Sequence, residues 1–380
     1  MPSADWMANI ERMYPTIARA LGNVDLAQLQ AALNTPRYHV SHPLRWILEG
    51  VHRPDSLQGQ VLGNTERALR TVAFGGTSDS WLSAKVRKAV QIPEKDGFGH
   101  IYSRLADACG ALAEIRACGY LRLCGLEVVP RSGKGFDLTA CTGSDPVAVE
   151  ISAVLMTQCE AQTLFDFHNR RSSYCDEVVI HPAGAPKEGE FTVDNIVHKF
   201  SQKAEEENRQ LPADRPALLW LDVQFEDWWS LSADEAWPLY VLPNGRFRTG
   251  GVWLGIYGRK GTPLLESESM SKGFPPQGQE AVHTTLRYPG YFAKQDVHAS
   301  AVVIAWPEST VIFENPDACQ RIPSQVLERL LCLPHFDWPR SWMRPFWQHD
   351  ADQAVAELRS RVKRMRDQID QLSQFVRLNW

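Results

Sequence analysis

The sequence predicts an α/β protein in which helices flank a mixed β-sheet. Three observations carry this prediction: a long helical pattern, three short strand-like runs after it, and then a second helix followed by a buried strand. These segments are residues 101–125 for the first helix, 126–130, 136–140 and 146–154 for the three strands, 193–211 for the second helix and 216–224 for the last strand. The order helix, three strands, helix, strand is typical of a mixed sheet with helices packed on it.

The boundaries of these elements follow from local chemistry. Over 101–125, apolar residues recur three and four positions apart, which predicts a helix, and Gly125 is expected to end it. Pro130 stops the first strand, and the segment RSGKG that follows is a tight loop. The run PALLWLDVQ at 216–224 is continuously apolar for most of its length, as a buried central strand is.

The remaining elements are expected from shorter patterns. Residues 25–35 and 81–92 have helical spacing, and GVWLGIYG at 251–258 is expected to be a strand. Residues 299–318 predict two strands around a turn that would extend the same sheet, and 324–333 a short helix.

The chain divides into three parts at this level. We expect a helical N-terminal region at 1–104, a core at 105–335 with a Trp-, Gly- and Pro-rich insertion at 225–295, and a long amphipathic helix at 350–380. The apolar residues of that last helix form a heptad seam, and its other face is basic. This pattern favours packing against the body or a homodimer through the helix, while phosphate binding by the basic face stays open.

Composition limits the class of protein. The chain has 380 residues, 44% of them hydrophobic and 22% charged, so most of it is expected to bury a core. The N-terminus shows no secretion signal, and eight Cys occur without a CxxC pair, which favours reduced thiols and a cytoplasmic location. The net charge of −5 argues mildly against tight nucleic-acid binding by overall charge alone.

The residues that carry chemistry lie on two neighbouring strands. Asp137 falls early in the second strand, and Glu150 late in the third. Because side chains alternate along a strand, Glu150 shares a face with Ser152, while Ile151 points to the other side. A Glu inside so apolar a strand is costly unless it is paired, bound to a metal or placed at the open end of the strand.

Two carboxylates that meet in this way suit a hard cation. With Asp137 opposite Glu150 and the backbone carbonyl of Ile151 beside them, the oxygen donors fit Mg²⁺ or Mn²⁺. Such a metal lowers the pKa of a bound water and stabilises charge on a phosphoryl oxygen. Phosphodiester hydrolysis is therefore the reaction that the residues favour.

The pattern resembles the core of the restriction-endonuclease-like, or PD-(D/E)xK, nuclease superfamily. The resemblance covers about 105–225 and extends to 316 if the later strands join the sheet. It implies that Asp137 and Glu150 are the two acids of the motif, and that Glu114 is the acid of the first helix. It also implies a metal-dependent nuclease acting on nucleic acid, DNA more than RNA, in DNA defence or repair.

One position departs from this pattern. Ser152 stands where the family has a lysine that positions the attacking water, and a neutral hydroxyl supplies no positive charge. Some members of the superfamily place the lysine elsewhere. In this chain Lys199 or Lys203 on the following helix, or Lys134 in the loop before Asp137, would take that role.

Structural explanations stand beside each of these assignments. Asp137 would cap a turn, Glu150 would be an edge charge, and Glu114 would be an exposed helical residue. Lys203 would form an ion pair with Glu207 one turn later on a solvated helix face. Loss of the lysine would then mark a catalytically inactive protein that binds nucleic acid or a partner protein.

Overall fold

The computed structural model describes most of the chain outside several loops and the C-terminal tail. The described residues are 4–22, 50–74, 79–91, 98–131, 133–143, 145–155, 162, 193–225, 233–237, 240–241, 247–248, 250–261, 263–264, 284–315, 317–337 and 340–341. The predicted helices at 25–35 and 350–380 lie outside them.

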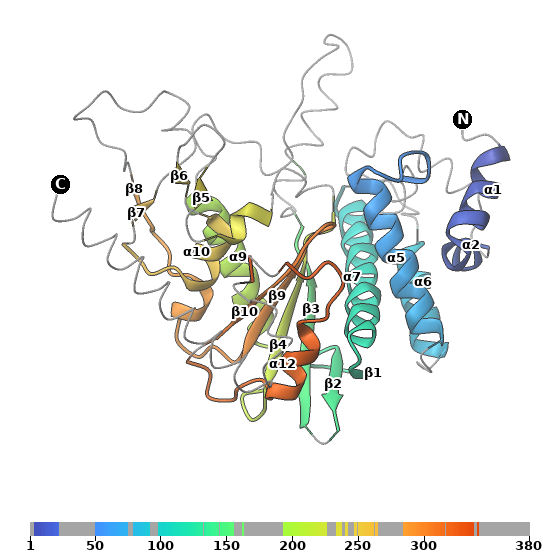
Figure 1. Cartoon of the computed structure of the whole chain (residues 1–380). Coiled ribbons are helices and arrows are strands. Elements are labelled where there is room, and N and C mark those ends of the chain that lie inside the picture. Colours follow the sequence, from blue (N-terminus) through green and yellow to red (C-terminus); the bar gives the residue numbers. More distant parts are fainter. Residues whose placement is uncertain are drawn as a thin grey trace, which may run out of the picture.

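A six-stranded mixed sheet forms the centre of the molecule (Figure 1). Its strands, in spatial order, are β1 (Glu127–Pro130), β2 (Leu138–Thr142), β3 (Asp145–Ala153), β4 (Ala217–Asp222), β9 (Ala301–Ala305) and β10 (Thr310–Glu314). The first three strands pair antiparallel, β3–β4 and β4–β9 pair parallel, and β9–β10 pair antiparallel. The predicted mixed sheet is confirmed, and the strands expected at 299–318 do join it.

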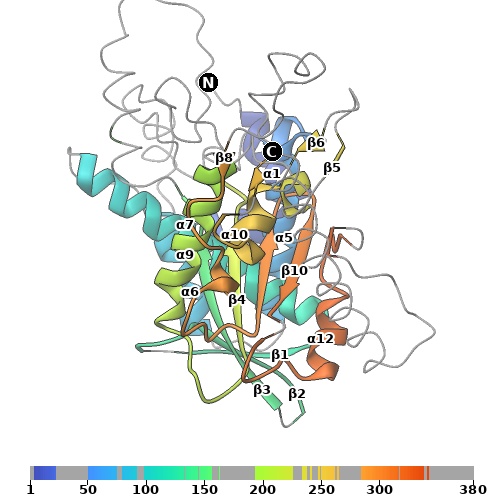
Figure 2. The ribbon, with the colours of Figure 1, turned by 90° about the vertical axis from the view of Figure 1, so that its left-hand side faces the viewer.

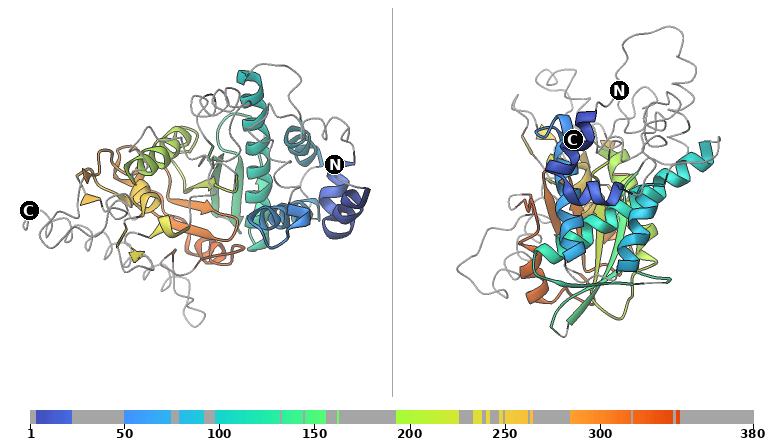
Figure 3. Two further views of the ribbon diagram at one scale, coloured as in Figure 1. Left: turned by 90° about the horizontal axis from the view of Figure 1, so that it is seen from above. Right: turned by 90° about the vertical axis from the view of Figure 1, so that its right-hand side faces the viewer.

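Helices cover both faces of this sheet. On one side lies α7 (Phe98–Leu123), with α5 (Leu57–Phe74) and α6 (Asp79–Ala89) packed beside it, and Tyr120 of α7 contacts Trp220 of β4 edge to face. On the other side lies α9 (Val193–Asn208), which belongs to the connection between parallel strands β3 and β4. Turning the molecule places α9 in front of the strands, and the view from above separates the two helical layers (Figures 2 and 3).

The segment at 251–258 is a helix, so the predicted strand is wrong. Helix α10 (Gly251–Tyr257) is buried along its whole length and packs on α9. A Cβ at Gly251 would lie 2.8 Å from the Cβ of Ile196, so glycine permits the two helices to approach closely. The carboxylate of Glu235 accepts the N–H of Gly251 at 2.6 Å and satisfies the start of the helix. A short apolar run that is buried all round has no periodicity to separate helix from strand.

The other described elements are short or belong to the N-terminal region. They are α1 (Ala4–Met13), α2 (Pro15–Leu21), α12 (Ser324–Leu330), three 3-10 turns (Gly50–His52, Ala233–Ala236, Tyr291–Ala293), and the two-residue strand pairs β5–β6 (Tyr240–Val241, Phe247–Arg248) and β7–β8 (Pro263–Leu264, Thr284–Thr285). The helix predicted at 324–333 is confirmed, and α6 confirms most of the helix predicted at 81–92.

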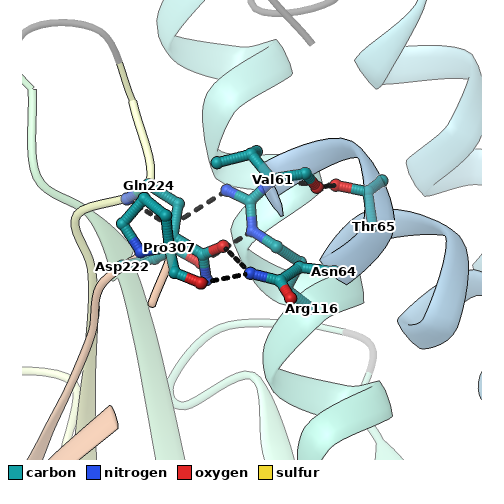
Figure 4. A network of polar contacts seen from close by, with 7 residues as sticks. All are labelled: Val61, Asn64, Thr65, Arg116, Asp222, Gln224 and Pro307. Atoms are coloured by element: carbon teal, nitrogen blue, oxygen red, sulfur yellow. Dashed lines mark hydrogen bonds and ion pairs between the residues drawn. The ribbon is translucent and has the colours of Figure 1, made fainter. Parts of the chain in front are cut away.

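A buried polar network fastens α5 and α7 to the sheet (Figure 4). Arg116 of α7 donates two hydrogen bonds of 2.9 Å to the carboxylate of Asp222, and neither side chain is exposed. Asn64 of α5 donates to Gln224 at 2.9 Å and to the carbonyl of Pro307 at 2.8 Å. Since each bond has a defined direction, the network fixes where α7 lies along β4.

Candidate functional site

The pairing of β2 with β3 brings the two predicted acids together. Leu138, the first residue of β2, pairs with Val149, and Asp137 directly precedes it, so Asp137 lies beside Glu150 at the end of the pairing. The N–H of Asp137 donates to the carbonyl of Val149 at 3.0 Å. One carboxylate oxygen of Asp137 also accepts the N–H of Ile151 at 2.9 Å, which holds the side chain across the strand.

Glu150 is a buried acid with one oxygen left over. Only 3% of the residue is exposed, and Oε2 is buried without a hydrogen-bond partner among the described residues. Burial raises the pKa of this carboxyl, and the charges of Asp137 and of Glu207 on α9 add to the rise. A buried carboxylate oxygen without a partner is costly, so this atom indicates a ligand position.

Glu207 links Ser152 to a lysine. Its Oε1 accepts the Ser152 hydroxyl at 2.9 Å and lies 2.6 Å from the ammonium of Lys203, and its Oε2 accepts the Gln210 amide at 2.9 Å. The ammonium of Lys203 also lies 3.8 Å from the carboxylate oxygen Oε2 of Glu206. Ser152, which stands where the sequence pattern expects a lysine, is thus connected to Lys203 through the carboxylate of Glu207.

Glu114 enters the site from the other helical layer. It forms an ion pair with Lys85 of α6, and the two side chains are 15% and 18% exposed. Burial raises the pKa of Glu114, while the charges of Lys85 and Lys88 oppose that rise. Glu114 is therefore not the exposed helical residue that the alternative to a site role expects.

The acids repel one another when ionised. Burial raises the pKa of Glu150 to about 9, and the negative charges of Asp137, Glu207 and Glu114 add to the rise. Burial likewise raises the pKa of Asp137 to about 7, with Glu114 adding to it and Lys85 opposing it. A cation placed between these groups would relieve the repulsion.

Asp137 and Glu150 are the two acids whose geometry bears on a metal ion. Within the described part of the chain, no group of three or more His, Cys, Asp or Glu side chains is arranged to hold a metal ion. Asp137 hydrogen-bonds to the residues on either side of Glu150, and the Oε2 of Glu150 is unpartnered among the described residues, so these two acids are the ones that would fit a cation that keeps several waters, as Mg²⁺ does. The backbone of Ile151 lies beside them, with its N–H already bound to Asp137.

The two remaining candidate lysines are Lys199 and Lys134. The side chain of Lys199 lies outside the described residues, although its backbone belongs to α9. Lys134 is exposed in the loop before Asp137, between Gly133 and Gly135, whose φ angles are +117° and +100°.

Two site residues were missed by sequence reasoning. Sequence reasoning treats Glu207 only as an ion-pair partner for Lys203, because the run AEEEN at 204–208 is typical of a solvent-exposed helix face. Lys85 carries no local signal at all, since it comes from the N-terminal region and meets Glu114 only in the folded chain.

The raised pKa values predict how stability depends on pH. A carboxyl with a higher pKa when folded binds its proton more tightly in that state, so its contribution to stability is complete below its unfolded pKa. For Glu150 that contribution is lost as the pH rises from about 4.5 to about 9. In EDTA, we expect Glu150→Gln to be more stable than wild type at high pH, with the difference growing by at most about 1.4 kcal/mol per pH unit. Urea unfolding at a series of pH values measures it, and a difference that stays constant with pH would contradict the prediction.

Comparison with protein-family models, with curated proteins and with solved structures gave no match. Among the helices that the structure describes, none is long and apolar enough to cross a membrane. The fold class, a mixed α/β protein with a six-stranded open sheet, is therefore defined by the architecture itself.

Proposed function

We propose that this protein is a metal-dependent phosphodiesterase that hydrolyses nucleic acid, built on a restriction-endonuclease-like core. The single observation that carries the proposal is the buried Glu150, whose Oε2 has no partner among the described residues and whose two chain neighbours both hydrogen-bond to Asp137. The order α7, β1, β2, β3, α9, β4 supports it, since it is the order that the resemblance implies. An acid buried at this cost is more readily explained by a bound cation than by packing.

Each side chain of the site has a separate task in this proposal. Asp137 and Glu150, with the carbonyl of Ile151, would hold Mg²⁺ or Mn²⁺, and Glu114 would support the cation from α7. When bound, the cation lowers the pKa of a water and stabilises negative charge on the phosphoryl oxygen. The water oxygen forms the new bond to phosphorus, the ester oxygen leaves, and a proton is transferred to that oxygen.

Lys203 takes the role of the lysine that Ser152 replaces. Glu207 fixes its ammonium at 2.6 Å, and the Ser152 hydroxyl fixes the same oxygen of Glu207 from β3. A positive charge held in this way orients the attacking water and stabilises the charge that develops on phosphate. The lysine would thus have moved from the strand to the helix, with Glu207 as its positioning residue.

Cleavage assays test the proposal directly. Plasmid, linear and single-stranded DNA and RNA are incubated with wild-type protein in Mg²⁺, Mn²⁺ or EDTA. We expect cleavage that needs the metal, and a loss of about 10²-fold or more for Lys203→Met. Glu205→Gln is the matched control, because Glu205 lies on the same helix with its side chain 55% exposed and pairs with Lys294 instead of Lys203, and it should keep wild-type activity. A Lys203→Met protein with full activity would remove Lys203 from the mechanism.

A catalytically inactive protein is the second candidate. One observation favours it: the ammonium of Lys203 is already paired with the carboxylates of Glu206 and Glu207. Such a protein would bind nucleic acid or a protein partner through the same fold. Wild-type protein that binds a nucleic acid and cleaves none, with either metal, would support this candidate over the enzyme.

A further inference from the structure

The loop that leads into Asp137 is tied to the candidate metal site through its backbone. The N–H of Arg131, directly after β1, donates to the carbonyl of Asp137 at 2.8 Å, and the N–H of Asp137 donates to the carbonyl of Val149 at 3.0 Å. The carboxylate of Asp137 accepts the N–H of Ile151 at 2.9 Å. The loop at 131–136 therefore lies beside the position proposed for the cation, where the phosphates that flank the cleaved bond would lie.

Arg131 presents a guanidinium group that is held in place but not neutralised. Its Cζ lies 4.1 Å from the ring centre of Phe136, a residue that is 9% exposed. The arginine itself is exposed, and no acidic side chain among the described residues pairs with it. A guanidinium stacked on an aromatic ring keeps the N–H groups at its edge available, and these groups match the oxygens of a phosphate. Because the stacking limits the rotamers of the side chain beforehand, less conformational entropy is lost when a ligand binds.

Lys134 adds a second cation to the same loop. It is exposed, and in the part of the chain that the structure describes it has no acidic partner. The glycines on either side, Gly133 and Gly135, have φ angles of +117° and +100°, which set the turn that carries the lysine. A Cβ added at either glycine would meet nothing within 4 Å beyond its chain neighbours, so a ligand has room to approach the backbone. Since the net charge of the chain is −5, affinity for a polyanion has to come from local cations of this kind.

We propose that Arg131 and Lys134 bind backbone phosphates of a nucleic-acid strand, next to the phosphodiester that the site would cleave. The inference rests on the proposed function and deepens it, because it assigns contacts that hold the substrate strand. Contacts to phosphates read no base, so binding through them does not depend on nucleotide sequence. Loss of either cation should raise the KM for a nucleic acid more than it lowers kcat, because the two side chains hold flanking phosphates and not the reacting atoms.

The dependence of binding on salt measures each phosphate contact separately. Fluorescence anisotropy with a short fluorescein-labelled single strand of DNA gives Kd at a series of KCl concentrations, with Ca²⁺ in place of Mg²⁺ and intact probe verified after each titration. Each lost phosphate contact lowers the slope of log Kd against log salt by about 0.7 for single-stranded DNA. We expect this decrease for Arg131→Met and for Lys134→Met, with binding about fivefold weaker at about 0.1 M KCl, and about twice the decrease for the double variant.

Two further variants distinguish a phosphate contact from a structural role. Arg131→Met keeps an apolar side chain over Phe136, and Arg131→Lys restores the charge and should recover the wild-type slope. If Arg131 only covered Phe136, neither substitution would change the slope. Lys260→Met is the matched control and should keep the wild-type slope, because Lys260 is an exposed cation far from the loop. It follows α10, whose Tyr257 donates to the carbonyl of Glu314 on β10, at the opposite edge of the sheet from β1.

The outcomes separate the inference from the function on which it rests. An unchanged slope in either single variant overturns the inference, even where the wild type cleaves DNA with a metal. An equal decrease for Lys260→Met also overturns it, since overall charge and not a contact would then govern binding. Wild-type protein that neither binds nor cleaves single-stranded DNA, duplex DNA or RNA overturns the proposed function and the inference together. Thermal unfolding of every variant verifies that a loss of binding is not a loss of folding.

Discussion

Glu150→Gln is expected to abolish cleavage, with kcat lower by about 10³-fold or more, while the protein stays folded. Glutamine has nearly the shape of glutamate, so the buried position on β3 keeps its packing. It removes the negative charge that would bind the cation at the oxygen now without a partner. The expected loss is large because the cation both activates the water and stabilises the phosphoryl charge.

The measurement combines cleavage with metal binding. Initial rates are taken across a range of Mg²⁺ and Mn²⁺ concentrations, and Mn²⁺ binding is measured by calorimetry without substrate. Asp145→Asn is the matched control, because Asp145 is an exposed acid at the beginning of the same strand. Cleavage by Glu150→Gln at the wild-type rate would remove the site from the mechanism, and unchanged Mn²⁺ binding would show that the cation lies elsewhere.

The sheet and its acids were accessible to sequence reasoning because their signals are local. Alternation placed Glu150 and Ser152 on one face, and the short loop between β2 and β3 limited the registers that could bring Asp137 beside Glu150. Crossover through α9 then required β4 to run parallel to β3. These steps use only neighbouring residues and the geometry of strands.

The residues that sequence reasoning missed depend on contacts between distant segments. Lys85 and Glu114 meet across two helices, and Glu207 meets Ser152 across the crossover between β3 and β4. Neither contact leaves a periodic pattern in the sequence. Helix α10 was missed for a different reason, since its glycines serve close packing against α9 rather than a turn. Burial on every side removes the polar face that identifies most helices.

Asp222→Ala is expected to reduce the free energy of unfolding by about 3–5 kcal/mol. The substitution leaves the guanidinium of Arg116 fully buried without its two hydrogen bonds of 2.9 Å. It also removes the acceptor of the Gln224 N–H, which lies 3.1 Å from the same carboxylate. The desolvation of a charge without a partner, more than the lost attraction, accounts for the size of the effect. Urea unfolding followed by circular dichroism measures it, with Asp214→Asn, an exposed acid, as the control.

The double variant Arg116→Met/Asp222→Leu shows whether the ion pair stabilises the fold or positions Glu114 at the site. Apolar side chains of similar volume leave no buried charge, so this protein should be more stable than Asp222→Ala and close to wild type. Arg116 lies two residues from Glu114 on α7, so the pair that fixes this helix along β4 also fixes how far Glu114 reaches toward Asp137. If the double variant recovers stability but cleaves slowly, the ion pair positions the site. If the double variant recovers both stability and cleavage, the Arg116–Asp222 pair only directs α7 onto the sheet during folding. A double variant as unstable as Asp222→Ala would contradict the desolvation argument.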